Sequence, residues 1–290
     1  MSYFYLILAV LLSAAMSVAG MFYEKNTAGK RNVSTLFNCM IAASNAICWG
    51  ILYIFDFTFH PYVLSYSAVY GICLALFFTG LTGGIKHGSA SVTSFFKQVA
   101  FVLVSVWGFF FWKEPVTPVV IVGIVLIVIA LLLCLLEPKP KNGGPKKTSV
   151  IWVLFLLLLL VSNAACNIVQ RTQQIEFYHR HGSQLMFFAA LFALVATVLL
   201  SLKDDKSEWK ETVEENWHIG LASGVCCALA NVFFILMAQT KLSTSFIYPV
   251  LAIGGVALST LASVLLFKER LRPLQWIGLG IGAVAVFLLS

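Results

Sequence analysis

The sequence predicts an all-α membrane protein with ten transmembrane helices, arranged as two inverted five-helix repeats. Apolar residues make up 60% of the chain and charged residues only 11%, whereas soluble domains carry roughly 25% charged residues. Residues 74–134 also align without a gap with residues 229–289. Landmarks of the first copy meet identical residues in the second: Lys86 on Lys241, Lys113 on Lys268, Pro118 on Pro273 and Gly123 on Gly278. Such a repeat inside apolar spans indicates two structurally related halves.

A helix needs about 20 mostly apolar residues to cross the hydrocarbon core of a bilayer. Five segments of the first half meet this requirement: 3–22, 35–55, 63–84, 88–111 and 117–136. Five more follow in the second half: 150–170, 183–202, 217–239, 243–267 and 273–289. All should be helical, because unpaired backbone groups are not tolerated in lipid.

Three spans have individual features. The first ends on small residues and has no positive segment ahead of it, so it is interpreted as a span and not as a signal peptide. The ninth contains Tyr248-Pro249 near its start, which predicts a kink. The tenth carries Gly278, Gly280 and Gly282, which allow close approach to a neighbouring helix.

The spans belong to a single transmembrane domain covering residues 1–290. Repeat 1 covers residues 1–137, a linker rich in Pro, Gly and Lys covers 138–149, and repeat 2 covers 150–290. Because each repeat has an odd number of spans, the second half must enter the membrane from the opposite side.

Loop charges predict the orientation. Loops on the side opposite the termini carry 14 Lys and Arg residues, and loops on the side of the termini carry four. Cytoplasmic loops are enriched in these residues, so both termini should be extracytoplasmic, in a multi-pass protein of a bacterial plasma membrane.

The ends of the two repeats carry a family signature. Phe111-Trp-Lys-Glu114, followed by Pro118 and Gly123, mirrors Phe267-Lys-Glu269, followed by Pro273 and Gly278. This pattern resembles the drug/metabolite transporter (DMT) superfamily, in particular its ten-helix EamA-like members. The resemblance implies export of small organic metabolites by alternating access. The related small multidrug resistance proteins use a Glu in their first helix, and span 3–22 contains no acid.

Lys97 is the main candidate for substrate binding. It lies mid-span in an apolar helix, where a lysine costs about 2.5 kcal/mol or more. Ser94 and Phe101 share its helical face, and Gln98 is adjacent. The side chain could anchor a carboxylate or phosphate, or carry a proton. A structural ion pair and snorkelling toward the surface are the alternatives.

Other candidates lie on several spans. Asn163 and Asn167 share one face of the sixth span, and Tyr70 and Tyr248 could contact substrate. Interhelical hydrogen bonding and core packing are the competing interpretations. Pro249, Glu114 and Glu269 are candidates for gating or structural roles.

The resulting prediction is a secondary transporter, not an enzyme, favouring export of an anionic or zwitterionic metabolite. The alternatives are an exporter of amphipathic drugs and a non-transporting lipid-handling or receptor-like membrane protein. No cofactor, metal or nucleic acid is expected. The expected partners are the substrate, membrane lipids and H+ as a candidate coupling ion, and the protein is expected to function as a monomer.

Overall fold

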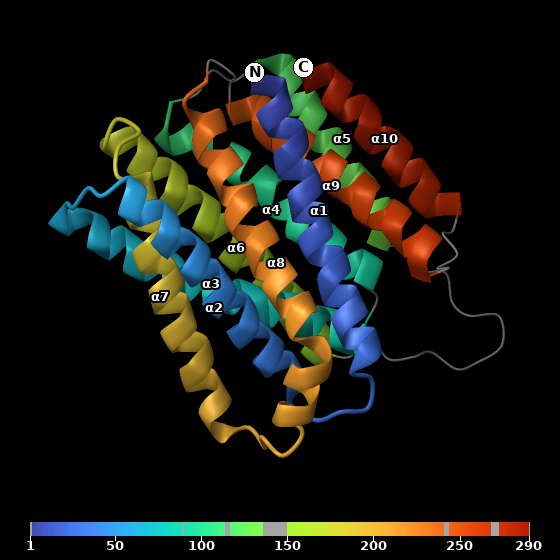
Figure 1. Cartoon of the computed structure of the whole chain (residues 1–290). Coiled ribbons are helices and arrows are strands. Elements are labelled where there is room, and N and C mark those ends of the chain that lie inside the picture. The colour runs from blue at the N-terminus through green and yellow to red at the C-terminus, as the bar shows by residue number, and fades with distance from the viewer. Residues whose placement is uncertain are drawn as a thin grey trace.

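The computed structural model describes residues 2–88, 90–113, 117–135, 150–240, 244–267 and 273–289. These residues form helices and contain no strand, so the all-helical prediction is confirmed for them (Figure 1). The first-half helices are α1 (Ser2–Asn26), α2 (Val33–Phe55), α3 (Pro61–His87), α4 (Ala90–Phe111) and α5 (Pro118–Leu135). The second-half helices are α6 (Val150–Glu176), α7 (Gly182–Leu200), α8 (Trp209–Ala238), α9 (Thr244–Phe267) and α10 (Pro273–Leu289), with a short 3-10 helix, η1 (Ser201–Lys203), after α7.

Among the described helices, seven are both long and apolar enough to cross a membrane, namely α1–α4 and α6–α8. Shorter apolar stretches lie in α5 and α9, at residues 118–130 and 250–266. Both marked chain ends lie at the same end of the bundle (Figure 1).

Several helices extend beyond the predicted spans, and α8 and α1 have consequences for the site. Helix α8 begins at Trp209 and not near residue 217, because its polar first turns bind the loop before α2. Helix α1 continues to Asn26 and therefore contains Glu24, a carboxylate that the expected span 3–22 left out. The statement that the first span lacks an acid is thus wrong for the complete helix.

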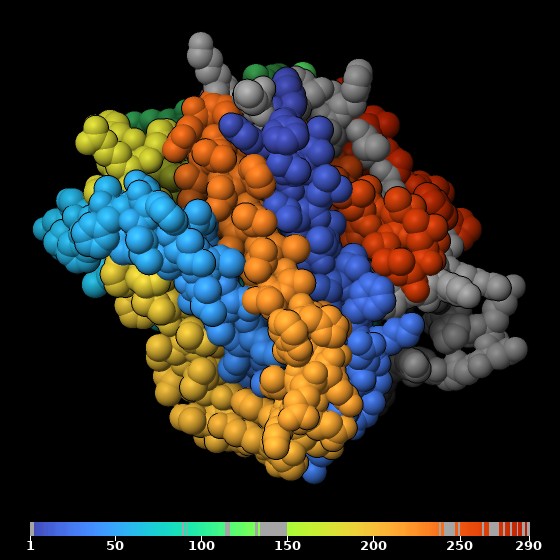
Figure 2. All heavy atoms as spheres, viewed as in Figure 1, coloured from blue at the N-terminus to red at the C-terminus, as the bar shows by residue number. Residues whose placement is uncertain are grey.

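Helices from opposite halves make most of the extensive contacts. Helix α3 packs on α6 and α7, while α8 packs on α1 and α2. Figure 2 shows α1, in dark blue, lying directly along α8, in orange, across one face. Further contacts join α4 to α6 and α9, and α5 to α10.

Small residues permit the closest of these approaches. A β-carbon added at Gly224 of α8 would lie 2.7 Å from the carbonyl oxygen of Ile41 in α2. One added at Gly71 of α3 would lie 2.5 Å from the carbonyl oxygen of Ala189 in α7. Both helix pairs therefore touch through their backbones.

Candidate functional site

Lys97 is buried in the centre of the bundle, with only 4% of its surface exposed. Its Nζ donates to the carbonyl oxygen of Ser13 at 2.9 Å and to the hydroxyl of Ser17 at 3.0 Å. It also lies 6.0 Å from the ring centroid of Phe77. These interactions hold the ammonium group between α1, α3 and α4 with neutral partners.

Amide side chains from the second half complete the surroundings. The Asn163 amide donates to the main-chain carbonyl of Lys97 at 2.6 Å. The Asn167 amide donates to the carbonyl of Asn163 at 2.8 Å, and the Tyr70 hydroxyl donates to Asn231 at 3.2 Å. Buried polar groups in a membrane protein must find such partners, and here several face one space.

That space is a central cavity of ≈ 50 Å³ between α1, α3, α4, α6 and α8. Its polar lining includes Ser13, Tyr70, Lys97, Asn163, Asn167 and Asn231, and its aromatic lining is Phe77, Phe101 and Phe234. At about 10–15 Å³ per water molecule, it has room for roughly four waters.

The predicted site residues fall into several groups. Five of them line the central cavity: Lys97, Phe101, Asn163, Asn167 and Tyr70. Tyr248 stacks on Phe101 with ring centroids 5.7 Å apart and lines a neighbouring cavity. Glu114 and Glu269 lie outside the described residues, as does the side chain of Pro249, whose backbone is part of α9.

Ser94 and Gln98 do not line the central cavity. Ser94 is buried, and its hydroxyl has no hydrogen-bond partner in the part of the chain that the structure describes. Gln98 packs against Gly255 of α9 and lines an apolar crevice with Ile127 and Val256. Gln98 follows Lys97 by one residue, and about 100° of helical rotation points the two side chains in different directions.

Several residues of the site were not among the predicted ones, including the two that bind the Lys97 ammonium. Ser13 and Ser17 bind the Lys97 ammonium, and they share one face of α1 because they are one turn apart. Their spacing was a usable signal, but small residues are common wherever membrane helices pack.

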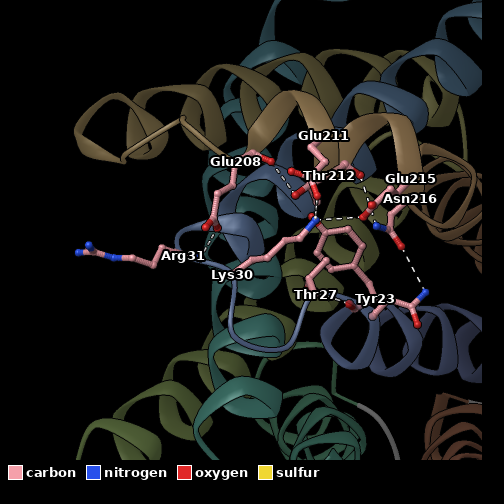
Figure 3. Close-up of polar contacts among 10 residues, drawn as sticks. Tyr23, Thr27, Lys30, Arg31, Glu208, Glu211, Thr212, Glu215 and Asn216 are labelled. Carbon is pink, nitrogen blue, oxygen red and sulfur yellow. Dashed lines mark hydrogen bonds and ion pairs between the residues drawn. The ribbon is translucent and has the colours of Figure 1, made fainter.

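Two loops fasten the halves together at opposite ends of the bundle. The loop between α1 and α2 is bound to the start of α8 (Figure 3). There Lys30 pairs with Glu211 at 3.2 Å and Glu215 at 3.0 Å. The main-chain N–H of Arg31 donates to Glu208 at 2.7 Å. We call these five residues the ionic joint.

The second joint connects the loop before α3 with the start of α7. The Gln184 side chain accepts from the N–H of His60 at 2.8 Å and donates to its carbonyl at 2.9 Å. The Ser183 hydroxyl donates to the Asp56 carboxylate at 2.6 Å, and the rings of His60 and His181 lie 5.6 Å apart. We call these five residues the histidine joint. Burial is the main factor that lowers the pKa of His181, and the charges of His60 and Arg180 lower it further.

A bundle of apolar helices around a buried polar cavity is the architecture that a membrane transporter requires. Residues 88–290 match the family model described as "Sugar transport protein". The match covers more than half of the chain, so the protein belongs to this family and is an integral, multi-pass membrane protein.

Two further comparisons concern individual proteins. A solved structure described as "Crystal structure of protein" is similar to this fold, with a TM-score of 0.69 and 13% sequence identity. The similarity covers 100% of this chain and 96% of the other, and at this identity it shows the fold alone. No curated protein matches the sequence.

Proposed function

We propose that the chain is a secondary transporter with ten spans in two inverted repeats, and that it works by alternating access around the central cavity. The pattern of helix contacts supports the repeat. In the proposed repeat, helices α1 to α5 match α6 to α10 in order. The contacts of α3 with α6 and α7 then correspond to those of α8 with α1 and α2, and the contact of α4 with α6 corresponds to that of α9 with α1. Three further contacts, α2–α7, α4–α9 and α5–α10, each join a helix to its own counterpart in the other half. A two-fold axis relates the two helices of such a pair to each other.

Local details support the same relationship. The close contact of Gly71 in α3 with α7 has its counterpart in that of Gly224 in α8 with α2. The residues preceding α2 and α7, Asn32 and His181, both adopt left-handed conformations, with φ of 56° and 60°. The equivalent loops of both halves therefore turn in the same way.

The substrate that we favour is a small polyhydroxylated solute of the sugar class. The observation that carries this proposal is the cavity lining, in which the amides of Asn163, Asn167 and Asn231 lie beside aromatic rings. Amides can both donate to and accept from hydroxyl groups, and the rings offer apolar faces. The name of the matched family agrees with this class.

A substrate with an anionic or zwitterionic group is the second candidate. It is favoured by Lys97, whose hydrogen-bond partners, Ser13 and Ser17, are neutral. A buried cation whose partners among the described residues are neutral would gain most from an anion supplied by the substrate. For this second candidate we also propose that the Lys97 side chain carries the coupling proton.

The two classes can be separated with polyhydroxylated probes of similar size and different charge. Purified full-length protein in liposomes is tested for saturable uptake and counterflow of D-glucose and D-gluconate. A neutral site should favour D-glucose. There the Lys97→Gln variant should show a KM for D-glucose about fivefold to tenfold higher than the parent, since one good hydrogen bond from residue 97 to the solute is weakened. An anion site should favour D-gluconate, and the Lys97→Gln variant should no longer take up D-gluconate in a saturable way. Saturable movement of neither probe would contradict both substrate classes.

Several finer properties remain predictions of this proposal. Export is the favoured direction, both termini are expected outside, and the protein is expected to act as a monomer. A proton gradient imposed on the same liposomes tests H+ coupling, because a coupled carrier would concentrate its substrate against a gradient. An exporter of amphipathic drugs would instead move organic cations or neutral dyes.

A further inference from the structure

One face of α6 carries a row of four buried amides. Asn163, Asn167, Gln170 and Gln174 are spaced by four, three and four residues, which places them on one side of the helix. Their exposed fractions are 8%, 8%, 4% and 3%. Asn163 and Asn167 belong to the central cavity, and the two glutamines continue the row toward the end of α6.

Gln170 and Gln174 line a second cavity of ≈ 20 Å³. Its walls also include Arg171 of α6 and Ile247 and Tyr248 of α9, and Asn167 and Phe234 are shared with the central cavity. Met237, Ile247 and Tyr248 pack in one cluster with Leu6 and Ala9 of α1. The second cavity therefore lies between the central cavity and the end of the bundle that holds both termini.

The Gln170 side chain brings an unpaired donor to this second cavity. Its Nε2 atom is buried and has no hydrogen-bond partner among the described residues. A buried donor without an acceptor costs free energy in any folded protein, and more so within a membrane. A solute that carried hydroxyl groups would supply the acceptor and could also donate to the amide oxygens.

We propose that the second cavity is a separate binding station for polyhydroxylated solutes, formed by Gln170, Gln174 and Tyr248. This inference depends on the proposed function in one respect, the class of solute that the station binds. A molecule leaving the central cavity toward the termini would pass Asn167 and Phe234, which border both spaces, and then meet Gln170. The row of amides would thus exchange hydrogen bonds with the solute along its path.

A cysteine reporter tests the station directly. In purified full-length Ile247→Cys protein, labelling of residue 247 by a thiol reagent is followed by peptide mass spectrometry, with D-glucose as the probe. We expect saturating D-glucose to slow labelling several-fold. Adding Lys97→Gln should preserve this protection, because Lys97 lines the central cavity and not the second one. Adding Gln170→Met should abolish it, whereas the exposed-site control Gln239→Met should keep it.

The opposite pattern would overturn the station. Protection that Lys97→Gln removes and Gln170→Met leaves intact would mean that only the central cavity binds, and absence of protection in the reporter itself would also refute it. Uptake into liposomes separates this result from the proposed function. Saturable D-glucose uptake without protection refutes the station alone, and protection without uptake refutes transport alone.

Discussion

The side-chain amide of Asn163 donates a 2.6 Å hydrogen bond to the main-chain carbonyl of Lys97. It joins α6 of the second half to α4 of the first at the residue that supplies the charge in the cavity. The position of the Lys97 backbone therefore depends on a side chain from the other half.

Replacing Asn163 by Leu removes this bond and one amide of the lining. We expect the KM of the transported probe to rise about fivefold to tenfold, consistent with the loss of about 1 kcal/mol per hydrogen bond. Counterflow in liposomes measures it. The matched control is Ser162→Ala, because the Ser162 hydroxyl bonds carbonyls of its own helix. Equal effects of both variants would argue against a specific role for Asn163.

Lys97→Met should leave the protein folded, since it removes a buried cation whose hydrogen-bond partners in the described ranges are neutral. The melting temperature should stay within a few degrees of the parent, while stabilisation by an anionic probe disappears. Lys97→Arg keeps a charge but displaces it, and an arginine does not release its proton. If Lys97 carries protons, the Arg variant should bind substrate and fail in coupled transport. Parent-like transport by both variants would reduce Lys97 to a packing residue.

Gly224→Ala should destabilise the contact of α8 with α2. The added methyl would lie 2.4 Å from Cβ of Ser44, so the two backbones must separate. Overpacking of this kind costs about 1–3 kcal/mol, and thermal unfolding in detergent measures it. Gly280→Ala is the matched control, because nothing lies within 4 Å of its added methyl. There the substitution should be neutral or slightly stabilising, since alanine favours a helix.

The histidine joint should weaken in acid. Because burial and neighbouring charges lower the pKa of His181, the folded joint favours the neutral ring. Its contribution is complete above the ordinary histidine range near 6.5 and is lost as pH falls below it. We expect the melting temperature to fall more between pH 7.5 and 5.5 in the parent than in His181→Asn. Asparagine tolerates the left-handed backbone at this position. His218→Asn, at an exposed residue, should behave like the parent.

The ionic joint should contribute little and should respond to salt. Lys30 is partly exposed and its carboxylate partners, Glu211 and Glu215, are more so. Exposed ion pairs are worth about 0–1 kcal/mol and are screened by salt. Lys30→Met should therefore lower the melting temperature slightly in dilute buffer and not at all in 1 M salt. A large loss that persists in 1 M salt would show that the joint acts through packing.

The sequence predicted the helical class, and it identified Lys97 and the Asn163–Asn167 pair as facing one space. A lone lysine in an apolar span must face protein or water, so its position alone was informative. The helix that supplies its partners was not predictable, because periodicity gives the face of a helix but not the neighbour that it meets. Ser13 and Ser17 were missed for this reason, and Gln98, expected beside the Lys97 face, lines the apolar crevice against α9.

Gln170 and Gln174 illustrate a second limit, which is that hydropathy does not locate the end of a helix. The predicted sixth span ended at residue 170, where polar residues begin, whereas α6 continues to Glu176. Hydropathy marks the end of an apolar stretch, but a helix continues as long as its backbone bonds are satisfied by the fold. The amide row extends across that boundary and became visible only with the complete helix.

The neutral hydrogen-bond partners of Lys97 have an electrical consequence. In an alternating-access carrier, the positive charge of Lys97 would be exposed to one side of the membrane and then to the other. Moving one elementary charge through the full membrane potential involves about 2.3 kcal/mol per 100 mV. The empty carrier would then respond to voltage. An anionic substrate would cancel that response on binding, whereas a sugar would leave it in place, so current recordings could distinguish the two cargoes without any radioactive tracer.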